Sequence, residues 1–467
     1  MLPLVKMALE LRPALRFVMR RHEGTGPVEA LWHEPVIGAA RRRRVAVLGR
    51  RGRGWGVAPR RIARRLCRRG SGGADHESRS HDHAGDASCP PRHGPAGEDM
   101  KQIPDLTACR ALFAGWVFAY HVNLQAHFDP LLGPLGGVVR SGAMGVDGFF
   151  ILSGMILAYA HPDLGPTLQR AGAFWVKRLV RIYPLHLLMI TLMAAMLGSA
   201  WMVGLQPREP GRFGPDELLS HLLLVQAWGF SDRWAWNYPS WSISAEWAGY
   251  LVFPLLLPLL RPARGAMLAG LIAACLAALG AAQLYAISAG LSLTYDGGLL
   301  RFFPEFIAGV LALRWTQAPR WPLPGHVVAW TGGAIVLGGA LVHSELVTVA
   351  GLFLALAGMM RTNLQGRPGL LGRIPGMVWL GEISYAYYMS FALIETLQAT
   401  LWRGLGLDPA GHKLLYGLGM TVPTLVLAAL AWALVERPAM RAHAAWRRRR
   451  HAGVSVAPVL QGSPQEQ

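Results

Sequence analysis

The sequence predicts an all-α protein, a polytopic membrane bundle of about ten transmembrane helices. Of its 467 residues, 52% are hydrophobic and only 16% are charged, whereas soluble domains are nearer a quarter charged. The hydrophobic residues also come in long blocks, and several blocks approach the ~20 residues that a helix needs to cross a bilayer. The lipid bilayer is therefore the expected surroundings of most of the chain.

Ten apolar blocks are expected to cross the membrane. An eleventh, at 218–229, is too short for a comfortable span, and a run of that length is more often re-entrant, interfacial or buried. We therefore expect it not to cross. The ten expected spans are 107–126, 144–160, 180–200, 240–260, 265–287, 299–314, 326–343, 345–360, 377–399 and 413–435.

The positions of the basic residues support this count, because cytoplasmic loops carry an excess of Lys and Arg. With ten spans and both ends of the membrane unit inside, every basic cluster falls on the cytoplasmic side. A crossing at 218–229 would move all later clusters outside. The clusters are Arg170/Lys177/Arg178/Arg181, Arg261/Arg264, Arg314/Arg320, Arg361/Arg367/Arg373 and Arg437 to Arg450.

Three segments follow one another along the chain. Residues 1–99 are rich in Arg, Gly and Ser and have weak apolar periodicity, which is typical of a basic disordered extension. Alternatively, Met100 is the true start and the extension is spurious. Residues 100–440 form the membrane domain, and 441–467 form a basic cytoplasmic tail. A functional basic extension would bind anionic lipid or nucleic acid, and we expect the bilayer and no nucleic acid as a partner.

The cysteines do not indicate a metal or disulfide framework. None of the four has the spacing of metal ligands, and two of them lie in or beside apolar segments. We expect no metal site. The four are Cys67, Cys89, Cys109 and Cys275.

The first span carries two ionisable residues on one helix face. Arg110 and His121 are eleven residues apart, and eleven steps of ~100° return to nearly the same direction, about 16 Å further along the helix. Ionisable groups within a span usually face a polar interior. A histidine with a pKa near neutrality accepts a proton from a hydroxyl. His121 is therefore a candidate catalytic base, and the alternative is a histidine that only hydrogen-bonds within the bundle.

Polar residues also mark the second and third spans. Asp147 is an acid at a membrane edge, where it needs a partner, and the small pair Ser153-Gly154 allows close helix packing. Arg178 and Arg181 lie one helical turn apart and point the same way. Arginine presents a planar fork that suits phosphate, so this pair is a candidate dock for a phosphorylated donor. The alternative is a purely topological signal.

The fourth span begins with Trp241-Ser242-Ile-Ser244-Ala-Glu246. Glu246 lies at the start of an apolar run, where an unpaired carboxylate is unfavourable, so it is a candidate to orient a histidine or to bind an acceptor sugar. Trp241 either stacks on a sugar ring or anchors at the interface. Two further acid–base pairs, Arg301 with Glu305 and Glu436 with Arg437, are expected to be local ion pairs at span edges.

Together these motifs resemble the acyltransferase 3 family of bacterial membrane O-acyltransferases. The resemblance covers about residues 105–440, and its motifs come in the expected order. They are Arg110 with His121, Gly145-Val-Asp147-Gly-Phe-Phe-Ile-Leu-Ser153-Gly154, Arg178-Leu-Val-Arg181-Ile-Tyr183-Pro184, Trp241-Ser242-Ile-Ser244-Ala-Glu246, Ile383-Ser384-Tyr385-Ala-Tyr-Tyr388 and Glu436-Arg437-Pro438.

The resemblance implies a ten-span bundle in the bacterial inner (cytoplasmic) membrane. It also implies acyl-coenzyme A, with acetyl-CoA expected, as donor substrate, and no bound cofactor. Carried over by position, His121 and Arg110 are essential and Arg178 and Arg181 serve the donor. Glu246 or Asp147 is expected to orient His121. The expected contacts with substrate come from Trp241, Ser242, Tyr385 and Tyr388.

Two departures from the family pattern matter. Many relatives carry a histidine three residues after the last tyrosine of the Ile383–Tyr388 motif, where this chain has Phe391. Some relatives also carry an extracytoplasmic SGNH hydrolase-like domain that completes the transfer, and the stretch after Glu436 is too short to hold one. We therefore expect direct acylation of the acceptor, or a separate extracytoplasmic transferase as partner.

Two other functions compete with this interpretation. A transporter of a small envelope precursor explains ten spans and buried ionisable residues equally well, but not Arg178 and Arg181 beside the stripe of Arg110 and His121. A scaffold is the third. Lipopolysaccharide, exopolysaccharide, a peptidoglycan sugar and a small glycoside remain open as acceptors, as do the acyl chain length and whether His121 acts as base or briefly carries the acyl group.

Overall fold

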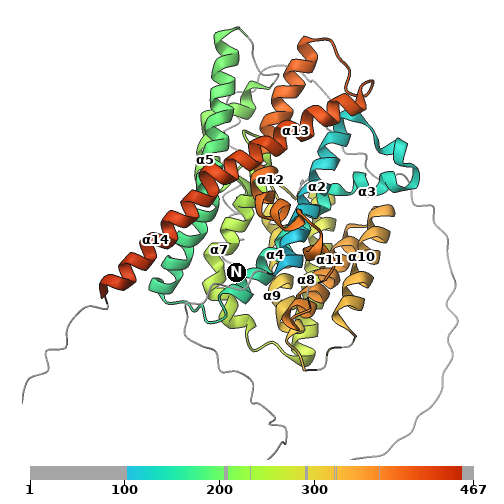
Figure 1. The fold of residues 1–467 in the computed structure, drawn as a ribbon. Coiled ribbons are helices and arrows are strands. Elements are labelled where there is room, and N and C mark those ends of the chain that lie inside the picture. Colours follow the sequence, from blue (N-terminus) through green and yellow to red (C-terminus); the bar gives the residue numbers. More distant parts are fainter. Residues whose placement is uncertain are drawn as a thin grey trace, which may run out of the picture. The chain divides into compact units, whose positions relative to one another are not determined.

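The ten predicted spans coincide with ten helical stretches of this computed structural model (Figure 1). The structure describes residues 103–454 except 205–208, 232, 290–292, 320, 322 and 368. Every regular element in this part is helical, which confirms the all-α fold. The stretches are α2 (Pro104–Ala126), α4 (Gly145–Ala160), α5 (Leu168–Met202), α7 (Trp241–Leu260), α8 (Gly265–Ala289), α9 (Gly298–Thr316), α10 (Gly325–Leu341), α11 (Glu345–Leu364), α12 (Met377–Gly404) and α13 (Lys413–Ala431), which continues through η8 (Trp432–Glu436) into α14 (Arg437–Val454).

Six helical segments of the described chain are long and apolar enough to cross a membrane. They are Asp129–Ala160, Leu168–Met202, Tyr238–Leu260, Gly265–Ala289, Glu345–Leu364 and Lys413–Arg449. The helix α10 is apolar but shorter, and α2, α9 and α12 carry several ionisable residues among their apolar ones. These features make the chain a multi-pass membrane protein. The predicted extension at 1–99, Met100 and the last part of the predicted tail lie outside the described residues.

Basic loops that are far apart in the sequence meet at one end of the bundle. Arg261 donates a hydrogen bond to the carbonyl of Leu164 at 2.7 Å, and Arg314 donates one to the carbonyl of Arg261 at 2.6 Å. Arg361 in turn donates to the carbonyl of Thr316 at 2.6 Å. These contacts agree with the prediction that the basic clusters lie on one side of the membrane. The assignment of that side to the cytoplasm remains a prediction.

The segment 218–229 forms no continuous helix. α6 (Pro215–Leu222) ends before Leu224, whose backbone φ is +57°, and the short turn η5 (Gln226–Phe230) contains Gly229 at φ +87°. The segment packs beside the middle of α5, where Tyr183 donates a hydrogen bond to the carbonyl of Leu222 at 2.8 Å. This broken, inward-packed segment agrees with the expectation that it does not cross.

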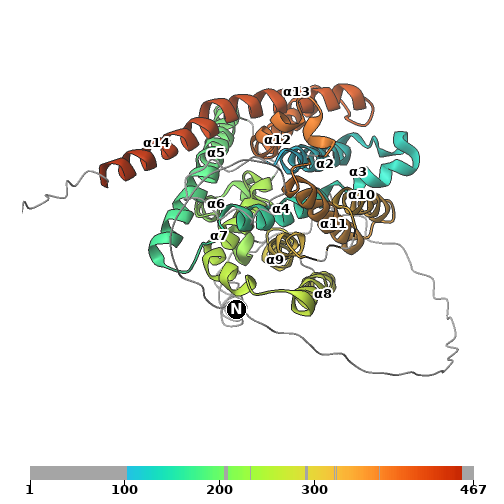
Figure 2. The same ribbon diagram turned by 60° about the horizontal axis from the view of Figure 1, so that its bottom comes forward.

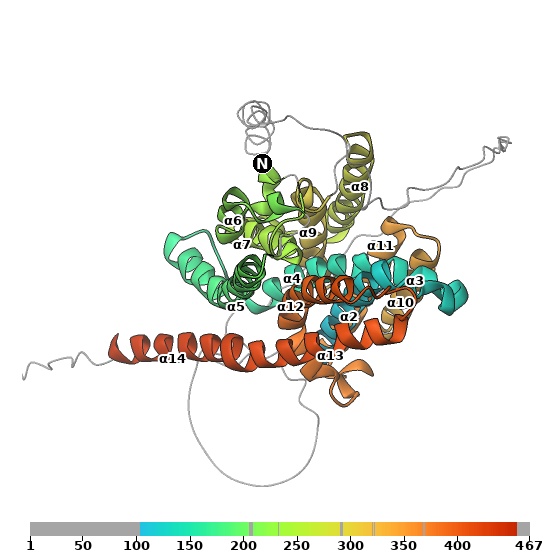
Figure 3. The ribbon, with the colours of Figure 1, turned by 90° about the horizontal axis from the view of Figure 1, so that it is seen from above.

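The second span packs very closely against α9. A Cβ atom placed on Gly154 would overlap the carbonyl oxygen of Phe306, and one placed on Gly309 would overlap the carbonyl of Ile151. The small pair Ser153-Gly154 therefore allows close helix packing, as predicted. Figure 2 shows α4 in the middle of the helices, and Figure 3 shows α13 and α14 along one flank with α8 on the opposite flank.

Candidate active site

Arg110 and His121 of α2 both face α12, which agrees with the shared helix face that their spacing predicts. The Nε of Arg110 lies 3.2 Å from the Oγ of Ser384, and the ring of His121 packs against the ring of Phe391 with centroids 4.7 Å apart. Phe391 occupies the position where many relatives carry a second histidine. Here it forms an apolar wall beside His121 and supplies no ionisable group.

The hydrogen-bond partner of His121 is a tyrosine that the sequence motifs did not single out. The hydroxyl of Tyr238, in η6 (Tyr238–Ser240), lies 3.0 Å from His121 Nδ1. The same hydroxyl donates a 2.5 Å hydrogen bond to Glu395 Oε2 on α12. All three side chains are half-buried. Sequence reasoning missed both partners because one precedes the fourth span and the other lies 274 positions after His121.

The two arginines of α5 have different surroundings. Arg181 forms a salt bridge with the buried Glu436 and lies over the ring of Tyr385, 5.7 Å from its centroid. Arg178 lies over the ring of Phe174 at 5.6 Å, and its Nε is buried without a hydrogen-bond partner. Of the pair, Arg178 is therefore the one with a buried donor hydrogen that has no partner.

Glu246 belongs to a polar cluster with Arg110 and not to the surroundings of His121. Its Oε2 accepts a 2.7 Å hydrogen bond from Tyr250, and its carboxylate also interacts with the Ser153 hydroxyl and the charge of Arg110. The charge of Arg181 also acts on Glu246, and Arg110 and Arg181 repel each other. Side chains from α2, α4, α5 and α7 thus form a half-buried polar interior, as expected for ionisable groups within spans.

Asp147 is held by an arginine from another helix. Arg301 donates one hydrogen bond to each carboxylate oxygen, from Nε to Oδ1 at 2.7 Å and from Nη2 to Oδ2 at 2.6 Å. In the described part of the chain, no hydrogen bond links Asp147 to His121. Among the described residues, Arg301 and Glu436 form their salt bridges across helices, with Asp147 and Arg181, and not with the expected local partners Glu305 and Arg437. Glu305 acts on Arg301 through its charge alone.

The expected substrate contacts are mostly engaged within the bundle. The hydroxyl of Tyr385 donates to the carbonyl of Ile182 at 2.7 Å, and the Ser242 hydroxyl lies 3.3 Å from that of Tyr388. Trp241 is buried, with its ring edge-on to Phe150. These contacts place the four residues in the core around the site.

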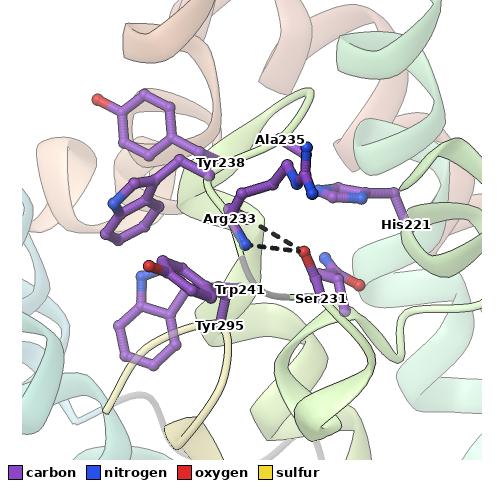
Figure 4. Close-up of a pocket in the computed structure, with 9 residues that line it drawn as sticks. His221, Ser231, Arg233, Ala235, Tyr238, Trp241 and Tyr295 are labelled. Atoms are coloured by element: carbon purple, nitrogen blue, oxygen red, sulfur yellow. Dashed lines mark hydrogen bonds between the residues drawn. The ribbon is translucent and has the colours of Figure 1, made fainter. Parts of the chain in front are cut away.

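A small cavity lies behind Tyr238 (Figure 4). Trp241, Tyr295 and the ring of Tyr238 line it on one side, while His221 and Arg233 lie opposite. The Tyr238 hydroxyl points away from this cavity, toward His121 and Glu395. The cavity therefore adjoins the His121 site with the tyrosine ring as the partition.

Within the described ranges, no three His, Cys, Asp or Glu side chains lie close enough to hold a metal ion. Cys109 and Cys275 are free and buried. Cys67 and Cys89 lie outside the described residues.

Comparison with known proteins agrees with these motifs. A family profile described as an acyltransferase domain matches residues 103–434. Acyltransferase MdmB of Streptomyces mycarofaciens is 30% identical over 372 residues, which cover 73% of this chain and 92% of that protein. Nodulation protein 10 of Rhizobium leguminosarum bv. viciae is 27% identical, covering 72% of this chain and 91% of its own.

Peptidoglycan O-acetyltransferase OatA of Listeria monocytogenes is 23% identical, over 72% of this chain and 56% of its own length. No solved structure matches the chain. The family match spans the first-span pair, the helix-packing motif, the two arginines and the Tyr385 motif. The chain therefore belongs to the acyltransferase 3 family of membrane O-acyltransferases.

Proposed function

We propose that this protein transfers an acyl group, acetyl in the simplest case, from acyl-CoA to a hydroxyl of a cell-envelope glycan or glycoside. The arrangement of α2 supports this most directly, because one face of this helix carries both Arg110, which belongs to the polar cluster with Glu246, and His121. Relatives named as a peptidoglycan O-acetyltransferase and as Exopolysaccharide production protein ExoZ support a glycan acceptor. The chain then works in the bacterial inner membrane, where donor and acceptor lie on opposite sides.

The donor enters from the basic end in this proposal. Coenzyme A is a cytoplasmic polyanion, and the unpaired Nε–H of Arg178 suits one of its phosphate oxygens. Arg181 is shared with Glu436, so a phosphate there competes with a carboxylate already in place. Arg178 is therefore the stronger phosphate ligand, and Arg181 supports it by adding positive charge.

The acyl group then reaches His121 along α2. Arg110 and His121 are eleven residues apart, which is about 16 Å along the helix. In this proposal the thin pantetheine arm of the donor spans that distance. His121 takes the proton of the acceptor hydroxyl, and the hydroxyl oxygen attacks the thioester carbonyl carbon. The carbon–sulfur bond breaks, and the leaving thiolate recovers the proton from the imidazolium. Neither a metal nor a bound cofactor takes part, and no separate extracytoplasmic transferase is needed when the acceptor reaches the site directly.

The function is tested with purified protein in proteoliposomes. Acetyl-CoA labelled in the acetyl group is supplied on one side, and envelope glycans from a deletion strain are supplied as acceptor. We expect label on glycan hydroxyls, detected by mass spectrometry as base-labile acetyl esters. A matched control is His343→Gln, because His343 is an exposed histidine in the turn between α10 and α11. Movement of an unmodified glycan without ester formation would support the transporter instead.

A further inference from the structure

Three side chains from separate elements form a continuous hydrogen-bonded line that ends at His121. Glu395 comes from α12, Tyr238 from η6 and His121 from α2. The two hydrogen bonds measure 2.5 Å and 3.0 Å. Neither Glu395 nor Tyr238 is part of the family motifs described above, and the polar cluster around Glu246 does not include them. Their role is therefore not explained by the proposed donor path.

The directions of these hydrogen bonds fix the tautomer of the histidine. A tyrosine hydroxyl has one proton, and here it is donated to the Glu395 carboxylate. Toward His121 the same oxygen acts only as an acceptor, so His121 Nδ1 carries the ring proton. Nε2 then has a free lone pair, which is the atom that a general base needs.

Aromatic rings pack against this line, and Arg212 is the charged group that acts on it. Phe391 covers one face of the imidazole, and Tyr120 packs edge-on at 5.2 Å. Arg212 acts through its charge on both Glu395 and Tyr238. Tyr388 interacts with Tyr238, and Tyr416 interacts with Glu395. Tyr238 is thus the direct link between the carboxylate and the imidazole.

We infer that Glu395 and Tyr238 are positioning residues that hold His121 with Nδ1 protonated and stabilise the imidazolium formed during transfer. This inference rests on the proposed function of His121 as the base. The acceptor proton moves to Nε2, the Nδ1 proton stays in place, and the Glu395 carboxylate offsets the positive charge through Tyr238. Phe391 gives the site a single imidazole, so the carboxylate acts on that ring alone.

The test is the pH dependence of kcat for Glu395→Gln and Tyr238→Phe, measured with acetyl-CoA as donor. Gln keeps the size and can still accept the tyrosine proton, but it has no charge. We expect kcat to fall about 10- to 100-fold with KM for acetyl-CoA changed less than about twofold. Because a carboxylate favours the imidazolium, its removal should also move the acidic limb of the profile to lower pH. Glu395→Asp should restore part of the rate and of the limb position.

Two controls separate this inference from others. Glu345→Gln removes an exposed carboxylate elsewhere and should change neither kcat nor the profile. In a His121→Gln background, Glu395→Gln should have no further effect on rate. A wild-type kcat and profile for Glu395→Gln would overturn the inference, and so would a lower kcat with an unmoved profile, which indicates packing alone. If His121→Gln keeps the wild-type rate, the proposed base itself fails, a result that does not depend on Glu395.

Discussion

The ion pair of Asp147 and Arg301 predicts a stability defect, not a catalytic one, for Asp147→Asn. Asp147 is 1% exposed and Arg301 15% exposed, and the pair has two hydrogen bonds. Removing one partner of a buried pair costs about 3–5 kcal/mol, because the other charge is left uncompensated. Glu305 follows Arg301 by one helical turn on α9 and acts on its charge, so it can partly replace the lost carboxylate. We therefore expect about 3 kcal/mol for Asp147→Asn.

The double variant Asp147→Asn/Glu305→Gln should then lose about 5 kcal/mol, because no replacement remains. Glu305→Gln alone should lower the free energy of unfolding by less than about 1 kcal/mol. Neither carboxylate oxygen of Glu305 accepts a hydrogen bond, so none is lost, and the glutamine amide can donate one to Asp147. Denaturation in mixed micelles, followed by tryptophan fluorescence, measures these differences in stability. The amount by which the double variant departs from the sum of the single variants gives the coupling between Asp147 and Glu305. Initial rates per folded molecule should stay within a few-fold of wild type. Unchanged stability together with a rate loss beyond about 100-fold would refute this reasoning and make Asp147 catalytic.

Three further predictions address the donor, the packing and the topology. Arg178→Lys should raise KM for acetyl-CoA more than Arg181→Lys does, because lysine lacks the fork and Arg181 already has a carboxylate partner; equal KM values for both variants and wild type would leave only a topological role. Gly154→Val should overlap the backbone of α9 and reduce the yield of folded protein, whereas Gly172→Ala, which meets open space, should not. Cysteines introduced near Arg261 and Arg361 should be labelled only from the cytoplasmic side, and labelling from outside intact cells would show that 218–229 crosses.

Apolar block length was enough to predict the helices. The ten expected blocks and the ten helical stretches agree to within a few residues at most ends, although α5 begins twelve positions earlier, at Leu168. Those first turns contain Lys177 and Arg178, and because they are polar they do not belong to an apolar block. That 218–229 is too short to be a span was predictable, because a bilayer sets a minimum length for a crossing helix. The break within it was not predicted.

The site was predictable only where its residues lie close together in the sequence. The spacing of Arg110 and His121 predicted their common face, because a single helix fixes both. The partners of His121 and Asp147 come from other helices, and sequence spacing contains no information on such contacts. The local pairing expected for Arg301 failed for that reason, since its better partner lies 154 positions earlier on a neighbouring helix.

The central claim is that His121 is the base for acyl transfer, and a single-turnover measurement on His121→Gln tests it most directly. Glutamine keeps a polar side chain of similar size, so the variant should insert, fold and bind coenzyme A with unchanged affinity. It cannot accept the acceptor proton at neutral pH, and general bases typically contribute about 100- to 10,000-fold. We predict a loss of acyl transfer from bound acetyl-CoA within that range. A variant that binds coenzyme A and keeps most of the wild-type transfer rate would contradict the account.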